Sequence, residues 1–240
     1  MKTSRSLPET DLARAALLPD DQKRIVLRGV RSFKPPHSFG PLRKVVPALY
    51  QARASLFDLP KRTWHDIEAA IRSYCGVNTH WVEPNLEVAR ALFEFNQQRG
   101  FKAVEWDFPF IPVGFGAKIK VWHDFYSVQG DRPVLAFVDP RRTDGLSKLG
   151  RLFIFSAMYH QIAVGDFEGA QFEILRFPVC PFSGKRKVEV FTFNENDVID
   201  LATLNSTIDS TFKIWREVLS ERLEEARHRP RTGTDDSFPF

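Results

Sequence analysis

The stretch from Gly116 to Gln161 constrains the fold more than any other part of this sequence. It holds two segments rich in β-branched and aromatic residues, GAKIKVWHDFYSV and PVLAFVDPRR, which are joined by Gln129-Gly130-Asp131, and a helical run, LSKLGRLFIFSAMYHQ, follows. This order predicts two strands joined by a turn and then a helix that packs on the sheet. Two acids, Asp124 and Asp139, fall late in the two predicted strands. If the protein has an active centre, we expect it there.

The flanking segments extend this pattern into a sheet covered by helices. Strand patterns occur at KAVEWDFPFIPV, AQFEILRFPV and KRKVEVFTF, and helical periodicity covers residues 61–76, 84–100 and 201–227. Thr63 is a candidate N-cap, and Gly76 and Gly100 are candidate helix ends. We therefore predict an α/β (α+β) protein with a central mixed sheet of about five strands, a helical N-terminal region and a long C-terminal helix.

Composition limits the class of protein. Hydrophobic residues make up 43% and charged residues 27%, which is typical of a globular protein. No apolar run approaches the roughly 18 residues of a membrane span, so we expect no membrane contact and a cytoplasmic location. We expect three parts: a basic helical region at 1–80, an α/β core with the long helix at 81–228, and a flexible tail at 229–240. The basic residues of the first part are candidates for a positive face: Lys23, Arg24, Arg28, Arg31, Lys34, Arg43 and Lys44.

Several common chemistries lack their motifs. The two cysteines, Cys75 and Cys180, are far apart and suggest neither a disulfide framework nor a zinc site. The six histidines are scattered, and neither an H-E-x-x-H pair, a G-x-S-x-G elbow nor a Walker-type glycine loop is present. These absences disfavour zinc hydrolase, serine hydrolase and nucleotide-binding functions.

From about Pro84 to Val179 the order of elements resembles the PD-(D/E)XK nuclease superfamily, in particular its RecB-like branch. The resemblance rests on Asp124 late in one strand and on Asp139-Pro140-Arg141, which ends the next strand 15 residues later. It implies a restriction-endonuclease-like core and a metal-dependent nuclease that hydrolyses phosphodiester bonds in DNA. The implied ligands of Mg²⁺ (or Mn²⁺) are Asp124, Asp139 and the carbonyl of Pro140. A helix glutamate of that family corresponds to Glu94 or Glu87, and Glu105 is a further candidate. Carboxylates are the hard ligands that Mg²⁺ prefers.

One position departs from the resemblance, because Arg141 stands where the family has lysine. Arginine stays protonated and cannot act as a general base, although it can bind a phosphate. Lys148, at the start of the next helix, could supply a displaced ammonium group. The catalytic candidates are therefore Asp124, Asp139, Arg141 and Lys148, with DNA as the expected partner.

Two alternatives to catalysis remain open. In the first, the centre is inactive and the chain binds nucleic acid or a protein. In the second, it is a structural or interaction protein that forms a homodimer or binds a protein partner through the apolar stripe of the C-terminal helix. That stripe comprises Leu204, Ile208, Phe212, Trp215, Leu219 and Leu223.

Overall fold

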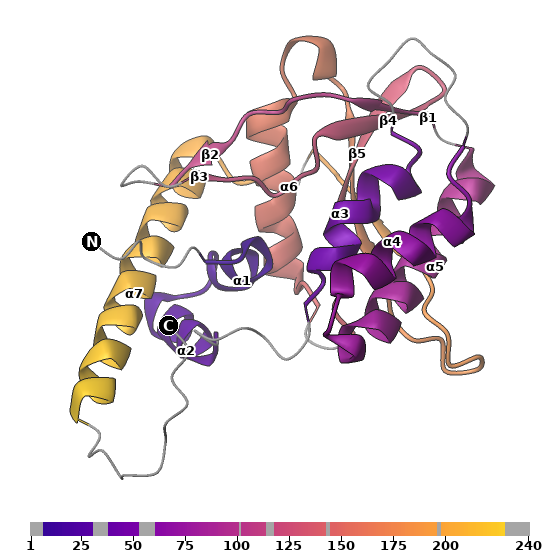
Figure 1. Cartoon of the computed structure of the whole chain (residues 1–240). Helices are drawn as coiled ribbons and strands as arrows, with labels where there is room; N and C mark the ends of the chain where they lie inside the picture. Colours follow the sequence, from indigo (N-terminus) through magenta and orange to yellow (C-terminus); the bar gives the residue numbers. More distant parts are fainter. Residues whose placement is uncertain are drawn as a thin grey trace.

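The computed structural model describes residues 7–30, 38–52, 61–100, 102–113, 118–142, 145–195 and 198–228, and it has an α+β architecture (Figure 1). The expected tail at 229–240 lies outside these residues. The α-helices are α1 (Glu9–Ala15), α2 (Asp20–Gly29), α3 (Gly40–Leu49), α4 (Trp64–Cys75), α5 (Val82–Arg99), α6 (Lys148–Ile162) and α7 (Leu201–His228). The strands are β1 (Lys102–Glu105), β2 (Ile111–Pro112), β3 (Lys118–Ile119), β4 (Phe125–Gln129), β5 (Arg132–Asp139), β6 (Gln171–Arg176) and β7 (Glu189–Thr192). Two short 3₁₀ helices, η1 (Thr79–Trp81) and η2 (Gly165–Phe167), precede α5 and β6.

The central sheet has five strands in the order β1-β4-β5-β6-β7. Neighbouring strands are antiparallel except β5 and β6, which run parallel and place Asp139 opposite Arg176. Helix α6 forms the crossover that a parallel pair requires. The predicted class is therefore confirmed: a mixed five-stranded sheet is flanked by helices and followed by a long C-terminal helix.

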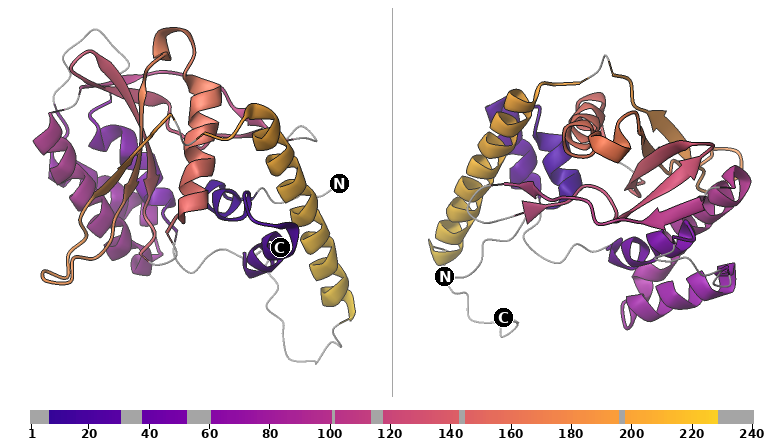
Figure 2. Two further views of the ribbon diagram at one scale, coloured as in Figure 1. Left: turned by 180° about the vertical axis from the view of Figure 1, so that it is seen from behind. Right: turned by 90° about the horizontal axis from the view of Figure 1, so that it is seen from above.

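Helices cover both faces of the sheet (Figure 2). Helices α3, α4 and α5 lie on one face, and α6 lies on the other with α1, α2 and α7 packed beyond it. Alternation along β6 explains the two layers, because Phe172 and Ile174 enter the core on the α6 side while Leu175 enters the core on the α5 side. Each face of the sheet thus has its own hydrophobic core.

The N-terminal helices contribute to both cores. Leu12 of α1 and Leu27 of α2 are buried on the α6 side, and Leu42 of α3 and Ile71 of α4 are buried on the α5 side. Each core therefore contains residues from both sides of the boundary expected near residue 80. In the part of the chain that the structure describes, no helix combines the length and apolarity that a membrane crossing needs.

Capping residues account for the predicted helix ends. Thr63 begins α4 with a capping box, in which its hydroxyl accepts from the N–H of Asp66 and the Asp66 carboxylate accepts from the N–H of Thr63. Gly100 ends α5 with a φ of 63°, a conformation that favours glycine. Ser147 caps α6 by accepting a hydrogen bond from the N–H of Gly150. Local chemistry in the sequence therefore sets these boundaries.

The described part of the predicted strand 116–128, which begins at Lys118, is not one continuous strand. Within this described part, only Lys118–Ile119 and the residues of β4 from Phe125 onward belong to ladders, and β3 pairs with β2 rather than with the central sheet. Between them, Val121 and Trp122 are consecutive buried residues, which no regular strand with one buried face allows. The resulting β2–β3 ribbon extends toward α7 (Figures 1 and 2).

The apolar stripe of α7 faces the core. Leu204, Ile208, Phe212 and Trp215 are buried, and α7 packs against α1, α2 and α6. Leu219 is partly buried against the same core, while Leu223 is 62% exposed. The surface considered for a homodimer is thus covered within the chain over most of its length.

Candidate functional site

Asp139 ends β5 and is buried where the chain leads into α6. Its Oδ2 accepts a hydrogen bond from the N–H of Leu146 at 2.9 Å, and its Oδ1 accepts one from the N–H of Arg141 at 3.4 Å. Both donors belong to the connection between β5 and α6. A buried carboxylate satisfied by nearby backbone N–H groups stabilises a turn. The geometry therefore gives Asp139 a structural role.

Asp124 precedes β4 and is held by a different set of partners. Its carboxylate forms an ion pair with Lys120 and accepts a hydrogen bond from the N–H of Phe108 at 3.3 Å. The direct pairing of β4 with β5 is confirmed, but the ladder covers only the three pairs from Ser127↔Val134 to Gln129↔Arg132. Toward Asp124, β4 is paired with β1, whereas toward Asp139, β5 is paired with β6. The structure describes no interaction that Asp124 and Asp139 share.

The Pro140-Arg141 pair joins three parts of the fold. The guanidinium of Arg141 donates to Thr10 Oγ1 at 2.6 Å and pairs with Asp11 at 2.7 Å, which fastens α1 to the end of β5. The carbonyl of Pro140 accepts from Arg186 at 3.5 Å. Arg141 therefore already has an acidic partner within the chain, which physically accounts for an arginine at this position.

The remaining candidates lie on exposed surfaces. Lys148 is exposed in the first turn of α6, and Glu94 forms an ion pair with Arg90 on α5. Glu87 pairs with Arg186, and Glu105 is exposed at the end of β1. Within the described ranges, no three His, Cys, Asp or Glu side chains form a group that could hold a metal ion.

The basic residues of the N-terminal region are largely neutralised. Acidic partners within the chain are Asp20 for Lys23, Glu217 and Glu221 for Arg24, Glu221 for Arg28, and Glu9 for Arg43. Lys44 lies over the ring of Tyr74. Arg31 and Lys34 lie outside the described residues. Since α7 supplies two of these acids, the positive face expected on α2 is balanced by α7.

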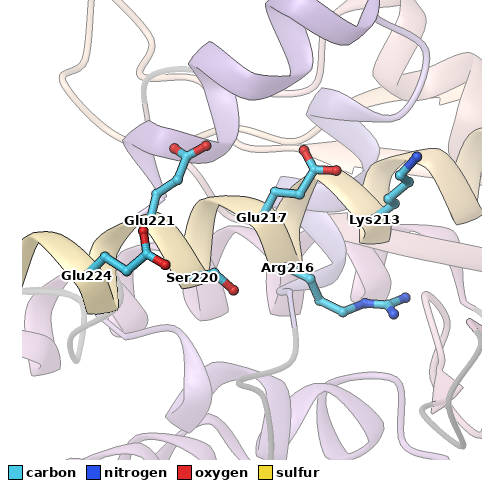
Figure 3. Close-up of a pocket in the computed structure, with 6 residues that line it drawn as sticks. All are labelled: Lys213, Arg216, Glu217, Ser220, Glu221 and Glu224. Carbon is cyan, nitrogen blue, oxygen red and sulfur yellow. The ribbon is translucent and has the colours of Figure 1, made fainter.

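A shallow hollow on α7 does not form a substrate site. Its lining residues are Lys213, Arg216, Glu217, Ser220, Glu221 and Glu224 (Figure 3). All six come from one helix, and Glu217 and Glu221 are engaged by Arg24 of α2. Sites for small ligands are normally concave and apolar, with walls from several elements. This hollow is therefore ordinary helix surface.

His123 stacks on the ring of Phe125, and the charges of Arg43 and Asp124 both act on it. Burial, followed by the charge of Arg43, lowers the pKa of His123 from 6.5 to about 4, while the charge of Asp124 opposes the shift. The imidazole is therefore neutral in the folded protein at neutral pH. Between pH 6.5 and 4 the unfolded chain binds a proton at this position that the folded chain does not.

We expect the free energy of unfolding to fall as the pH drops from about 6.5 to 4, with about 2–3 kcal/mol of the loss due to His123. Urea titrations of the wild type and of His123→Gln across this range measure that share as the difference between the two slopes. The variant should lose less stability, since it lacks the titrating group. Parallel pH profiles for the two proteins would contradict the assignment.

Several large apolar side chains are exposed at different places on the described surface, among them those of the next two regions. Val104 lies in the edge strand β1, and Trp106 and Phe110 follow it in the chain; we call these three exposed residues the aromatic ledge. Phe182, in the connection between β6 and β7, is 98% exposed. Neither region was among the sequence-based candidates. A signal was present for Phe182, because an aromatic residue inside the turn Pro181–Gly184 is unusual where glycine, proline and polar residues predominate.

Comparisons with known proteins match the chain to a family model and to a named relative. The sequence model of a family described as "Sliding clamp-binding bacterial toxin SocB" matches residues 10–225. A relative named "DNA replication inhibitor toxin SocB", from Caulobacter vibrioides (strain NA1000 / CB15N), is 32% identical over 240 residues, which cover 99% of this chain and 98% of the relative. No solved structure matches the chain.

These matches show that the assignment to the PD-(D/E)XK nucleases is wrong, and with it the nuclease and hydrolase function. The physical origin of the error is clear in the geometry. Asp139 and Arg141 resemble a nuclease motif in sequence, but they stabilise a turn and bind α1. The metal-binding and catalytic roles of Asp124, Asp139, Pro140, Arg141, Lys148 and Glu94, and the Mg²⁺ or Mn²⁺ ion, were implied by that resemblance and stay untested predictions.

Proposed function

Because the chain belongs to the SocB family of sliding clamp-binding bacterial toxins, we propose that it binds a bacterial sliding clamp and thereby inhibits DNA replication. The observation that carries this proposal is the extent of the family match. Residues 10–225 include every strand and nearly the whole of every helix from α1 to α7. The partner is therefore a protein rather than DNA, and the place of action is the bacterial cytoplasm, where the chromosome is replicated.

The described structure supports inhibition by binding to the clamp rather than by catalysis of a reaction. The acids once considered for catalysis are engaged in turns and ion pairs, while large apolar side chains are exposed at the aromatic ledge and at Phe182. An inhibitor that works by occupancy blocks a fraction of clamps set by its concentration relative to the Kd. Inhibition then requires at least as many toxin molecules as clamps, because one molecule cannot act on many clamps in turn.

The test is clamp-dependent primer extension with purified components, using the sliding clamp encoded in the same genome as this chain. We expect extension to fall as the protein is added and to stop near one protein per binding site, while extension by the same polymerase without the clamp continues. Calorimetry should give a saturable complex of the two proteins. An absence of binding at about 10 μM clamp, corresponding to a binding free energy weaker than about −7 kcal/mol, would overturn the proposal. Equal inhibition without the clamp would do the same.

A further inference from the structure

Helix α2 lies beside α7 and contributes few apolar side chains to the core (Figures 1 and 2). Among its apolar residues only Leu27 is buried, while Val26 is partly buried and Ile25 is 71% exposed. Helix α6, by contrast, buries several large apolar side chains, among them Phe153 and Ile154. Because the hydrophobic contribution to stability scales with the apolar area that is buried, α2 is held by it far less than α6.

The other buried side chain of α2 is charged. The side chain of Lys23 is 6% exposed, and its ammonium group donates to Ser210 Oγ of α7 and pairs with Asp20 at 3.2 Å. The carboxylate of Asp20 is itself 74% exposed. Burying a charge costs free energy unless the charge is paired and hydrogen-bonded. The docked position of α2 therefore depends on polar contacts, where that of α6 depends on apolar ones.

Two arginines of α2 form ion pairs with acids of α7. Arg24 pairs with Glu217 and, at 2.6 Å, with Glu221, and Arg28 pairs with the second oxygen of Glu221 at 2.5 Å. Figure 3 shows Glu217 and Glu221 on the same side of α7. A hydrogen bond from Arg28 lowers the pKa of the Glu221 carboxyl, which is therefore charged at neutral pH. The four side chains are between 34% and 57% exposed, so dissolved salt screens their attraction.

Arg222 of α7 binds the end of α2. Its Nη2 donates to the carbonyls of Arg28 at 2.7 Å and Val30 at 2.8 Å, at the helix end where carbonyl groups lack partners within the helix. Its Nη1 is buried and has no hydrogen-bond partner in the described part of the chain. A buried donor without an acceptor costs free energy, which is recovered when water reaches it. This cost opposes the docking of α2 on α7.

The rest of the core on the α6 side has its own sources of stability. Strand β6 supplies Phe172, α6 supplies Ile154, and the first half of α7 supplies Trp215, all of them buried. Regions of a protein that bury few apolar contacts open locally at a lower free energy than the core does. The separation of α2 from α7 therefore leaves the sheet and α6 with most of their packing.

We propose that α2 is a salt-sensitive strap, which undocks from α7 as a unit while the sheet, α6 and the first half of α7 stay folded. The contacts that hold the strap are those of Arg24, Arg28 and Arg222, and salt weakens the two ion-paired ones directly. Undocking uncovers Leu27 and the side of α7 that the strap covers. The inference concerns a motion within the fold and goes beyond the proposed clamp binding, on which it does not depend.

Hydrogen–deuterium exchange of the full chain, followed by mass spectrometry of its peptides, measures this motion. The amides of α2 should exchange about 10-fold faster in about 1 M sodium chloride than in about 0.05 M, while those of α6 and β6 exchange equally in both. Glu221→Gln removes an ion-pair partner of both Arg24 and Arg28. Its α2 amides should therefore exchange at low salt nearly as fast as those of the wild type at high salt. Arg222→Gln should speed exchange most at the end of α2.

The matched control is Glu68→Gln. Glu68 also pairs with an arginine, Arg72, and its side chain is 32% exposed against 35% for Glu221, but this pair lies on α4, on the other face of the sheet. Its α2 amides should exchange as in the wild type at each salt concentration.

The comparison of the wild type at two salt concentrations needs no variant, so it stands even where a variant does not fold. Equal exchange of the α2 amides at both concentrations would overturn the inference. A parallel rise in the exchange of α6 and β6 would also overturn it, because the whole protein would then be opening. Exchange of α2 in Glu221→Gln as slow as in Glu68→Gln would refute the part assigned to the ion pairs.

Discussion

Replacing Arg99 with leucine is expected to lower the free energy of unfolding by about 3 kcal/mol or more. Glu173 lies in the central strand β6 with its side chain 2% exposed, and both of its carboxylate oxygens bind the guanidinium of Arg99, at 2.7 and 2.8 Å. Gln171 donates a further hydrogen bond to Glu173 at 2.7 Å. Without Arg99, a buried carboxylate loses its cation, and burying an uncompensated charge is costly. Urea denaturation of the two proteins measures the difference.

A second ion pair of α5 provides the control. Arg90 pairs with Glu94 on the exposed side of the same helix and lies over the ring of Trp64, so Arg90→Leu should change the free energy of unfolding by at most about 1 kcal/mol. Combining Arg99→Leu with Glu173→Leu removes both charges and should recover a large part of the loss. Equal effects of Arg99→Leu and Arg90→Leu would refute the idea that burial of Glu173 makes the first pair important.

Trp215→Ala is expected to destabilise the protein by about 3–5 kcal/mol, because it empties the centre of the core between α7 and the helices packed on it. Trp215 is among the largest fully buried side chains, and its neighbours along α7, Phe212 and Val218, are buried with it. Thermal unfolding and urea denaturation both report this loss. A loss of this size in the free energy of unfolding would show that the apolar stripe of α7 is part of the core. Truncation of an exposed side chain lowers this free energy only slightly.

Leu223 belongs to the same stripe and supplies the matched control. Because it is exposed, Leu223→Ala should change stability by no more than about 0.5 kcal/mol. Sedimentation of this variant separates packing from self-association, since a stripe that joined two copies would lose affinity when Leu223 is shortened. A stable, folded Trp215→Ala protein with a changed oligomeric state would show that the stripe serves an interface between chains.

The helices and the fold class could be predicted from the sequence because their signals are local. The capping residues Thr63 and Gly100 and the spacing of apolar residues along α7 specify the helix boundaries and the buried face without knowledge of distant contacts. The segment around Val121 and Trp122 could not be predicted in this way. The alternation of apolar and polar residues predicts a strand, but it does not tell whether that strand pairs with the central sheet. The pairing of β3 with β2 depends on tertiary packing.

The candidate site was harder to predict than the fold. An acid near the end of a strand can bind a metal, a backbone N–H or a lysine, and the sequence does not distinguish them. Asp139 binds the N–H of Leu146, and Asp124 binds Lys120. Interaction surfaces leave a still weaker signal, since the exposure of a side chain such as Phe182 is known only from the fold. The basic N-terminal helices likewise looked like a nucleic-acid surface until their acidic partners on α7 were placed beside them.

The packing of α2 on α7 also affects the order in which the chain can fold. Arg24 reaches Glu217 across 193 residues of sequence, and Leu12 and Leu27 share a core with Trp215. During synthesis, α2 must therefore wait for α7 before its apolar face is covered, whereas α1 can pack on α6 first, and contacts of such long range slow folding. Until α7 has left the ribosome, the growing chain exposes the side chains that will later form this core. Chaperones and proteases consequently have their best access to the protein before its last long helix docks.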